Sequence, residues 1–182
     1  MRGNNCMNCS EYLADFLIRN EIKDIFGYAG GYIVPFMDAL SRRNEINVHV
    51  CYNEQGCAFA ANGYARMSGK LGVYFTTSGP GAVNALGGLA DAWFDGVPLM
   101  GICGNVPTNE MKGFSGIRQI GFQEMDIVSM TRNITKYSVT PNSAEDFPEI
   151  ISQAYNMALL GRKGGVLIDF PYNIQKADIV SR

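Results

Sequence analysis

Short apolar segments of strand length alternate about six times with amphipathic segments along this chain of 182 residues. Glycine, proline, asparagine or serine stands at most of the joints, where these residues favour turns. Strands that alternate with helices form a parallel sheet covered by helices on both faces. We therefore predict an α/β fold, a three-layer α/β/α domain with a roughly six-stranded parallel sheet flanked by helices.

The spacing of the apolar residues places the individual elements. The expected strands are residues 25–28, 46–52, 71–76, 99–103, 134–139 and 165–170. The expected helices are one capped by Ser10, then residues 35–40, 54–67, 78–94, 124–130 and 143–160. In a sheet of this kind, ligands bind beyond the carboxyl ends of the strands. The candidate site residues are therefore those that directly follow a strand.

The composition argues against several classes of function. A formal net charge of −2 leaves no excess of Lys and Arg to neutralise phosphates, so we expect no nucleic acid partner. No apolar run approaches the ~20 residues that span a membrane, so we expect no membrane partner. Five cysteines without a signal-like leader indicate a reducing, cytoplasmic location. Cys6 and Cys9 form a lone C-x-x-C pair, and since structural zinc needs four ligands we expect no metal site.

A long block of the chain is almost free of charge. Residues 71–107 contain only two charged side chains, Asp91 and Asp95. The helices expected at residues 54–67 and 78–94 are small or apolar on nearly all sides, which is typical either of central core helices or of an interface. Because a domain of this size leaves little chain to cover two such helices, we favour an interface with a subunit or another domain.

Glu54 stands directly after a predicted strand and opens a predicted helix behind Asn53. A carboxylate in this position ordinarily stabilises the helix dipole by about 0.3–1 kcal/mol, which is a purely structural role. No Lys or Arg occurs between Arg43 and Arg66 to pair with this carboxylate. For an arbitrary Glu in this position, the residues alone favour the structural role.

Six motifs follow one another in a characteristic order. They are residues 26–31 (FGYAGG), 53–56 (NEQG) leading into 62–66 (NGYAR), 77–84 (TSGPGAVN), 104–107 (GNVP), 122–124 (FQE) and 165–171 (GVLIDFP). From about residue 10 to residue 175, the chain resembles the N-terminal pyrimidine-binding (PYR) domain of thiamine-diphosphate-dependent enzymes. Within that family it is most similar to the large subunit of acetolactate synthase.

The resemblance implies a set of site residues. Residues 1–175 would form the PYR domain, and residues 176–182 would begin a linker or tail. Glu54 would be catalytic, because the family's Glu in this motif bonds N1′ of the cofactor's pyrimidine and lets the 4′-amino group act as the base. Residues that would bind thiamine diphosphate are Gly30, Gly31, Glu54, Ser78, Gly79, Pro80, Gly81 and Asn84. Phe122, Gln123 and Arg118 would line the substrate pocket, where Arg118 or Lys112 would meet the carboxylate of a 2-oxo acid unless both are simply solvated loop charges.

The resemblance also implies partners. The family binds the cofactor's diphosphate through Mg²⁺ on a second domain that carries a Gly-Asp-Gly motif, and no such motif occurs in this sequence. We therefore expect Mg²⁺ only through a diphosphate-binding domain of the same or another chain, with FAD possible in the full-length enzyme. A homodimer or tetramer is expected, and this chain alone should be inactive.

The activity expected from the resemblance is that of a transferase or lyase, with acetolactate synthase-like decarboxylation and carboligation of small 2-oxo acids. The alternatives are a 2-oxo-acid decarboxylase subunit and a non-catalytic PYR-like assembly module. The sequence departs from the family at Ala29, where Pro is usual, and at Asn53 and Phe59, where His is usual; its loop after residue 104 is also longer. A Rossmann dinucleotide site is disfavoured, because Asn84 stands at the third position of the glycine fingerprint.

Overall fold

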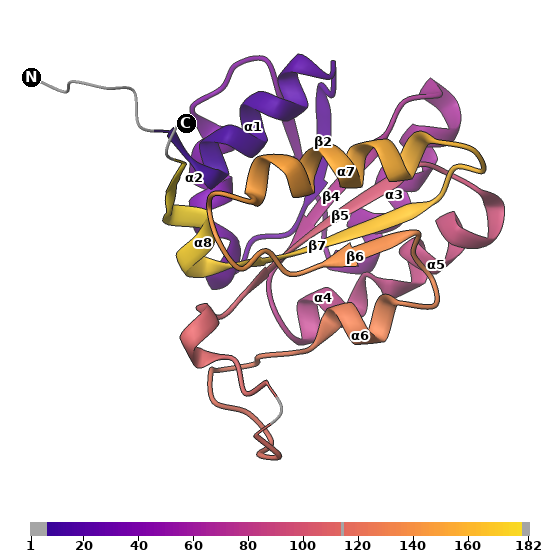
Figure 1. Ribbon diagram of the computed structural model, residues 1–182. Helices are drawn as coiled ribbons and strands as arrows, with labels where there is room; N and C mark the ends of the chain where they lie inside the picture. The colour runs from indigo at the N-terminus through magenta and orange to yellow at the C-terminus, as the bar shows by residue number, and fades with distance from the viewer. Residues whose placement is uncertain (1–6, 114, 180–182) are drawn as a thin grey trace, which may run out of the picture.

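A parallel sheet of six strands runs through the centre of the computed structural model, which describes residues 7–113 and 115–179 (Figure 1). The order of its strands is β3-β2-β4-β5-β7-β6, and every neighbouring pair is parallel. The strands are β2 (Asp24–Gly27), β3 (Asn47–Val50), β4 (Gly72–Thr76), β5 (Leu99–Asn105), β6 (Tyr137–Val139) and β7 (Gly165–Pro171). The predicted parallel sheet is confirmed.

Helices cover both faces of the sheet (Figure 1). One face carries α1 (Cys9–Arg19), α2 (Val34–Ser41), α7 (Phe147–Leu159) and α8 (Tyr172–Lys176). The other face carries α3 (Glu54–Ser68), α4 (Pro80–Asn84), α5 (Leu86–Asp95) and α6 (Ile127–Thr131). The 3₁₀ turns η1 (Gly31–Ile33) and η2 (Thr108–Glu110) follow β2 and β5, and β1 (Met7–Asn8) pairs antiparallel with β8 (Asp178–Ile179). The predicted three-layer architecture is therefore confirmed.

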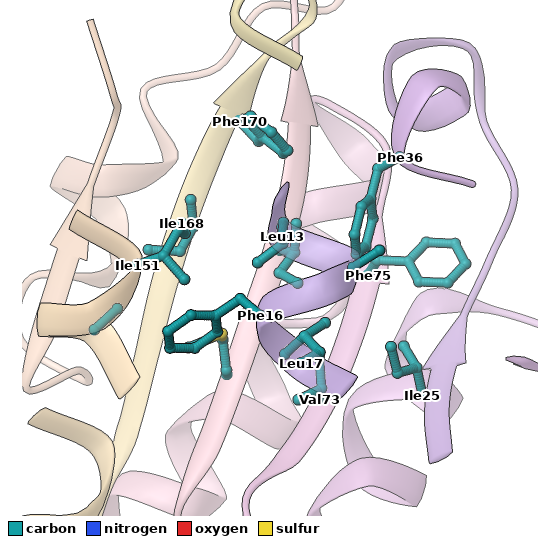
Figure 2. Packing of buried hydrophobic residues seen from close by; sticks show 14 of the residues in the cluster. Leu13, Phe16, Leu17, Ile25, Phe36, Val73, Phe75, Ile151, Ile168 and Phe170 are labelled. Carbon is teal, nitrogen blue, oxygen red and sulfur yellow. The ribbon is translucent and has the colours of Figure 1, made fainter. Parts of the chain in front are cut away.

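Alternating side chains of each central strand feed two separate cores, because successive residues of a strand point to opposite faces. In β4, Val73 and Phe75 belong to the core under α1, α2 and α7, whereas Tyr74 belongs to the core under α3 and α5. Figure 2 shows part of the first core, in which Phe36 lies between Phe75 and Phe170. The ring centroid of Phe36 lies 6.1 Å from that of Phe75 and 6.5 Å from that of Phe170. These aromatic contacts join the sheet to α2.

Several boundaries differ from the sequence prediction. The strand expected at 46–52 is only the four residues of β3, and all four are exposed because β3 is an edge strand. The strand expected at 134–139 covers only β6, the helix expected at 124–130 begins at Ile127, and the helix expected at 143–160 begins at Phe147. The single His of the chain, His49, lies on the exposed sheet edge, where its Nε2 is 2.8 Å from Oδ1 of Asp24.

The cap of the first helix was also predicted wrongly. Asn8, not Ser10, is the N-cap of α1. The Asn8 side chain accepts a hydrogen bond from the Glu11 amide at 2.9 Å, and the Glu11 carboxylate accepts one from the Asn8 amide at 3.2 Å. This reciprocal capping box satisfies two free amides at once. Ser10 offers no such pair, and its hydroxyl is buried without a partner among the described residues.

The helix expected at residues 78–94 is two helices, α4 and α5, that meet at Ala85. The break lets each part make a different contact. Asn84, at the end of α4, donates a hydrogen bond to Glu54, whereas α5 packs closely on α3 through Gly88. A Cβ at Gly88 would lie 2.6 Å from the Cβ of Ala58. Small residues at this crossing therefore set the distance between α3 and α5.

We predict opposite outcomes for two neighbouring glycines of α5. Gly88→Ala should lower the unfolding free energy of the chain by about 1–3 kcal/mol, because the added methyl overpacks the contact with Ala58. Gly87→Ala is the matched control. A Cβ at position 87 would lie 3.4 Å from its nearest neighbour, Nε2 of Gln55, and alanine is more favourable than glycine in a helix by up to ~1 kcal/mol. Urea unfolding measures both. Equal effects of the two substitutions would contradict this account of the helix packing.

Candidate functional site

Three connections meet at the carboxyl edge of the sheet, after β2, β3 and β4. The chain leaves β2 for the edge strand β3 on one side, and it leaves β4 for β5 on the other side. Connections that diverge in this way open a crevice between neighbouring strands, which is where parallel α/β sheets bind ligands. The residues that the sequence singled out after these strands therefore lie around one crevice.

Glu54 is the first residue of α3 and is held in a defined orientation. Asn53 caps the helix, since its side-chain oxygen accepts a hydrogen bond from the Gly56 amide at 2.7 Å. Nδ2 of Asn84 donates to Oε2 of Glu54 at 2.8 Å. The other oxygen, Oε1, faces Gly81, where an added Cβ would lie 3.1 Å away. The half-buried carboxylate takes part in no ion pair within the described ranges.

Thr77 joins the turn after β4 to the turn after β2. Its Oγ1 accepts a hydrogen bond from the Tyr32 amide at 3.3 Å. A Cβ at Gly30 would lie 2.3 Å from the Cβ of Thr77, so only glycine fits there. Apart from the adjoining backbone, no atom in the described part of the chain would lie within 4 Å of a Cβ at Gly31. The fold itself thus requires Gly30, whereas the exposed backbone of Gly31 is open to contact by another molecule.

The long loop between β5 and α6 contacts the turn after β4 at Gln123 and Gly79. Gly79 has φ +57°, and a Cβ there would lie 2.4 Å from the backbone oxygen of Gln123. Gln123 itself has φ +57°, which is uncommon for a residue with a side chain and tends to occur at functional sites. The neighbouring Ser78 is buried, and its hydroxyl has no partner in the described part of the chain.

These residues surround an open groove of about 550 Å³. Its lining consists of Glu54, Thr77, Pro80, Gly81, Val83, Asn84 and Gln123. Five of these were predicted as site residues. Thr77 was a candidate because it directly follows the predicted strand at residues 71–76, but it was given no binding role. Val83 was not predicted, although it stands in the motif at residues 77–84.

The other predicted site residues lie outside the lining of the groove. Gly30, Gly31, Ser78 and Gly79 form the turns beside it. Phe122 is 67% exposed on the long loop, which projects from the body of the domain (Figure 1). Arg118 is exposed on the same loop and donates to the side chain of Gln119 at 2.8 Å.

The Glu124 carboxylate accepts hydrogen bonds from several backbone amides of the long loop. The donors are the amides of Ile120, Gly121 and Lys112, at 2.8 to 3.2 Å. Burial raises the pKa of Glu124, but these amide bonds outweigh it and leave the pKa below its ordinary value. Nζ of Lys112 donates to the Arg118 carbonyl at 3.1 Å. The Lys112 and Arg118 side chains therefore bond within the loop itself.

One buried cluster beside the loop was missed by the sequence analysis. Asp169 in β7 is 3% exposed, and both of its carboxylate oxygens accept from Nδ2 of Asn105 at 3.0 Å. Thr140 donates to the same carboxylate at 2.8 Å. A cavity of about 170 Å³ borders the cluster. The available signal was an acidic residue inside the otherwise uncharged segment at residues 165–171.

Comparison with known proteins identifies the family. Residues 7–130 match the family model described as "Thiamine pyrophosphate enzyme, N-terminal TPP binding domain". The chain belongs to this family. The resemblance inferred from the six sequence motifs is thereby confirmed.

The most similar relatives include acetolactate synthases. Over 170 residues the chain is 44% identical to "Acetolactate synthase 1, chloroplastic" of rice, Oryza sativa subsp. japonica, and to "Acetolactate synthase, chloroplastic" of Arabidopsis thaliana. It is 40% identical over 163 residues to "Acetolactate synthase catalytic subunit, mitochondrial" of Saccharomyces cerevisiae. These alignments cover 92%, 92% and 90% of this chain but only 25%, 24% and 23% of the relatives. The chain thus spans about a quarter of the length of the curated relatives it matches.

Other predictions can be compared with the structure only within its described ranges. No helix among residues 7–113 and 115–179 is long and apolar enough to cross a membrane. In the same ranges, no group of three or more His, Cys, Asp or Glu side chains could hold a metal ion. Cys6, one half of the C-x-x-C pair, lies outside the described residues. The cytoplasmic location stays a prediction, since the plant and yeast relatives are described as chloroplastic and mitochondrial.

Asp169 predicts a pH dependence of stability. Burial raises its pKa from 3.8 to about 7, although hydrogen bonds from Asn105 and Thr140 lower it, and the Asp126 carboxylate raises it further. Between these two values the folded chain keeps a proton that the unfolded chain has lost, so stability decreases as the pH rises. The whole decrease is on the order of 4 kcal/mol for Asp169 alone. Asp169→Asn should abolish it in urea unfolding at about pH 5 and about pH 8, and parallel pH dependences of variant and wild type would contradict this.

Proposed function

We propose that this chain is the pyrimidine-binding half of an acetolactate synthase-like enzyme that decarboxylates and ligates small 2-oxo acids, with Glu54 as its catalytic carboxylate. One observation carries the proposal. Glu54 lies in a groove at the carboxyl edge of the sheet, with Oε2 held by Asn84 and Oε1 facing the glycine at position 81. This arrangement leaves a directed carboxyl oxygen beside open space, which a purely structural helix carboxylate does not need.

The residues present fit the aminopyrimidine of thiamine diphosphate. A flat ring needs backbone that can approach closely, and the exposed Gly31 supplies it. The Ser78 hydroxyl is buried and has no hydrogen-bond partner among the described residues, which is unusual for a buried polar group and leaves it able to bond a ligand. When bound, thiamine diphosphate supplies a nucleophilic carbon and an electron sink for the departure of CO₂ from a 2-oxo acid.

Each residue around the groove has a defined task in this proposal. Glu54 would hold and return a proton at a ring nitrogen of the bound pyrimidine. Asn84 fixes the rotamer of Glu54, because its amide donates to Oε2, whereas Oε1 has no hydrogen-bond partner among the described residues. Gly81 keeps the approach to Oε1 open, since a side chain there would contact that atom. Gln123, together with Phe122 on the same loop, would line the substrate side of the groove.

The groove is open, and the site therefore needs a second domain to close it. Phe59 and Met67 of α3 and Phe94 of α5 are 44%, 89% and 70% exposed, so the α3 and α5 layer presents large apolar side chains to its surroundings. Such surfaces suit burial against a partner. The greater length of the relatives fits a diphosphate-binding domain elsewhere in the same or a second chain, which would hold Mg²⁺. A dimer or tetramer, and FAD in the full-length enzyme, belong to the same proposal.

Glu54→Gln tests the proposal directly. In the assembled enzyme, with the diphosphate-binding domain present, this variant should lower kcat at least about 100-fold, because the amide cannot transfer the proton. Glu45→Gln is the matched control, since Glu45 is an exposed carboxylate after α2, remote from the groove. The measurement is turnover of pyruvate at saturating cofactor. If both variants turn over pyruvate at the wild-type rate, the chain acts as a non-catalytic assembly module instead.

Arg118 is proposed to meet the carboxylate of the 2-oxo acid once the loop contacts substrate. Arg118→Ala should then raise KM for pyruvate about tenfold, the usual loss for a hydrogen bond to a charged group, and change kcat little. Lys163→Ala is the control, since Lys163 is exposed at the opposite end of the sheet, just before β7. An unchanged KM in the Arg118 variant would leave this residue as a solvated loop charge.

A further inference from the structure

The long loop after β5 is closed at both ends by one side chain, that of Asn105. Its Oδ1 accepts from the adjacent Val106 amide at 2.8 Å, at the start of the loop. Its Nδ2 donates to the carbonyl of Met125 at 3.2 Å, 20 residues further along the chain. The loop that carries Phe122 and Gln123 therefore begins and ends on the two polar atoms of one amide.

We propose that Asp169 is a positioning residue for the substrate side of the groove, because it fixes the orientation of the Asn105 amide and thereby holds residues 121–125 in place. The inference rests on the proposed function for the role of that segment in binding substrate. The contacts themselves stand independently of it.

The acceptor-only character of a carboxylate explains why an acidic residue stands at this position. The Asn105 amide could in principle rotate by half a turn and exchange its oxygen and nitrogen. Both oxygens of Asp169 lie 3.0 Å from Nδ2 and can only accept while the carboxyl is ionised. The carboxylate thus selects the orientation in which Nδ2, not Oδ1, faces the Met125 carbonyl. In the reversed orientation, Oδ1 of Asn105 would face the carbonyl oxygen of Met125. The hydrogen bond that holds the end of the loop would then be lost.

Residues 121–125 connect the Asn105 amide to the groove. Gly121 packs against Val106, where an added Cβ would lie 2.7 Å from Cγ1, and its amide donates to the Glu110 carbonyl at 2.9 Å. Two residues later, Gln123 adopts its left-handed backbone conformation against Gly79. The bond from Asn105 to the Met125 carbonyl ties the far end of this segment, beside Gln123, to β5. A shift of about 1 Å at a substrate-positioning group is enough to impair binding or rate strongly.

The variant that tests this is Asp169→Asn, which keeps the shape of the side chain but can donate as well as accept. In the assembled enzyme at about pH 8, where the wild-type carboxyl is largely ionised, it should raise KM for pyruvate about tenfold. The cofactor concentration for half-maximal activity should stay within about twofold, because Glu54 and Asn84 are untouched. Thr140→Val is the control, compared with the wild type at about pH 9 so that the carboxyl stays ionised without the Thr140 hydrogen bond that lowers its pKa. It removes a hydrogen bond to the same carboxylate without touching Asn105, so its KM should match that of the wild type.

A double-mutant cycle and hydrogen exchange separate positioning from general loss of structure. Asn105→Ala should raise KM similarly, and the combined variant should be no worse than Asn105→Ala alone, because both residues act through one contact. In the chain itself, Asp169→Asn should speed amide exchange at Gly121 and Glu124, while Ile102 in β5 stays protected.

Two outcomes overturn the inference: an equal change of KM in Asp169→Asn and Thr140→Val, each relative to the wild type at the same pH, or exchange that rises equally in β5 and in residues 121–125. Failure of the proposed function looks different. In that case the wild-type assembly shows no cofactor-dependent turnover. The hydrogen-exchange experiment still measures whether Asp169, through Asn105, holds residues 121–125 in place.

Discussion

The order of the strands is the constraint on which the site depends. Because β2 and β4 are neighbours whose connections leave in opposite directions, the turns after them separate at the carboxyl edge of the sheet. The turn after the edge strand β3 joins them there and delivers Glu54 at the start of α3. An order in which β3, β2 and β4 were not neighbours would separate these turns, although the same residues could still form the same helices and strands.

Close approach is the second requirement, and the glycines at this edge meet it. The chain contains 21 glycines, and those around the groove differ in what they allow. Gly30 makes room for Thr77, Gly79 for the backbone of Gln123, and Gly81 for the Glu54 carboxylate. At Gly31, none of the described residues beyond the adjoining backbone comes within 4 Å of the position that a Cβ would take. That difference separates glycines needed to assemble the edge from one that leaves backbone accessible to another molecule.

Residues at the end of β7 and in α8 hold two of the segments around the site. Asp169 contacts Asn105, whose amide bonds both ends of the long loop, and Gln175 of α8 donates to the Tyr32 carbonyl at 2.7 Å. The long loop is therefore connected to β7 through Asn105, and the turn that contains Gly31 is connected to α8 through Tyr32. The groove itself is open, and the α3 and α5 layer carries exposed apolar residues; both features fit one half of a shared site.

Sequence alone determined the α/β alternation and the start of α3 behind the Asn53 cap, because periodicity and capping depend on residues only a few positions apart. The role expected of Glu54 came from the resemblance of six motifs to a known family. Sequence alone also misplaced the cap at Ser10, overextended β3 and merged α4 with α5, since short signals at element ends are easily shifted by tertiary contacts. The tertiary structure alone decided that Asn84 holds Glu54 from 30 residues away and that Asp169 holds Asn105 from 64 residues away. Such pairs depend on which strands become neighbours, and no local pattern encodes that.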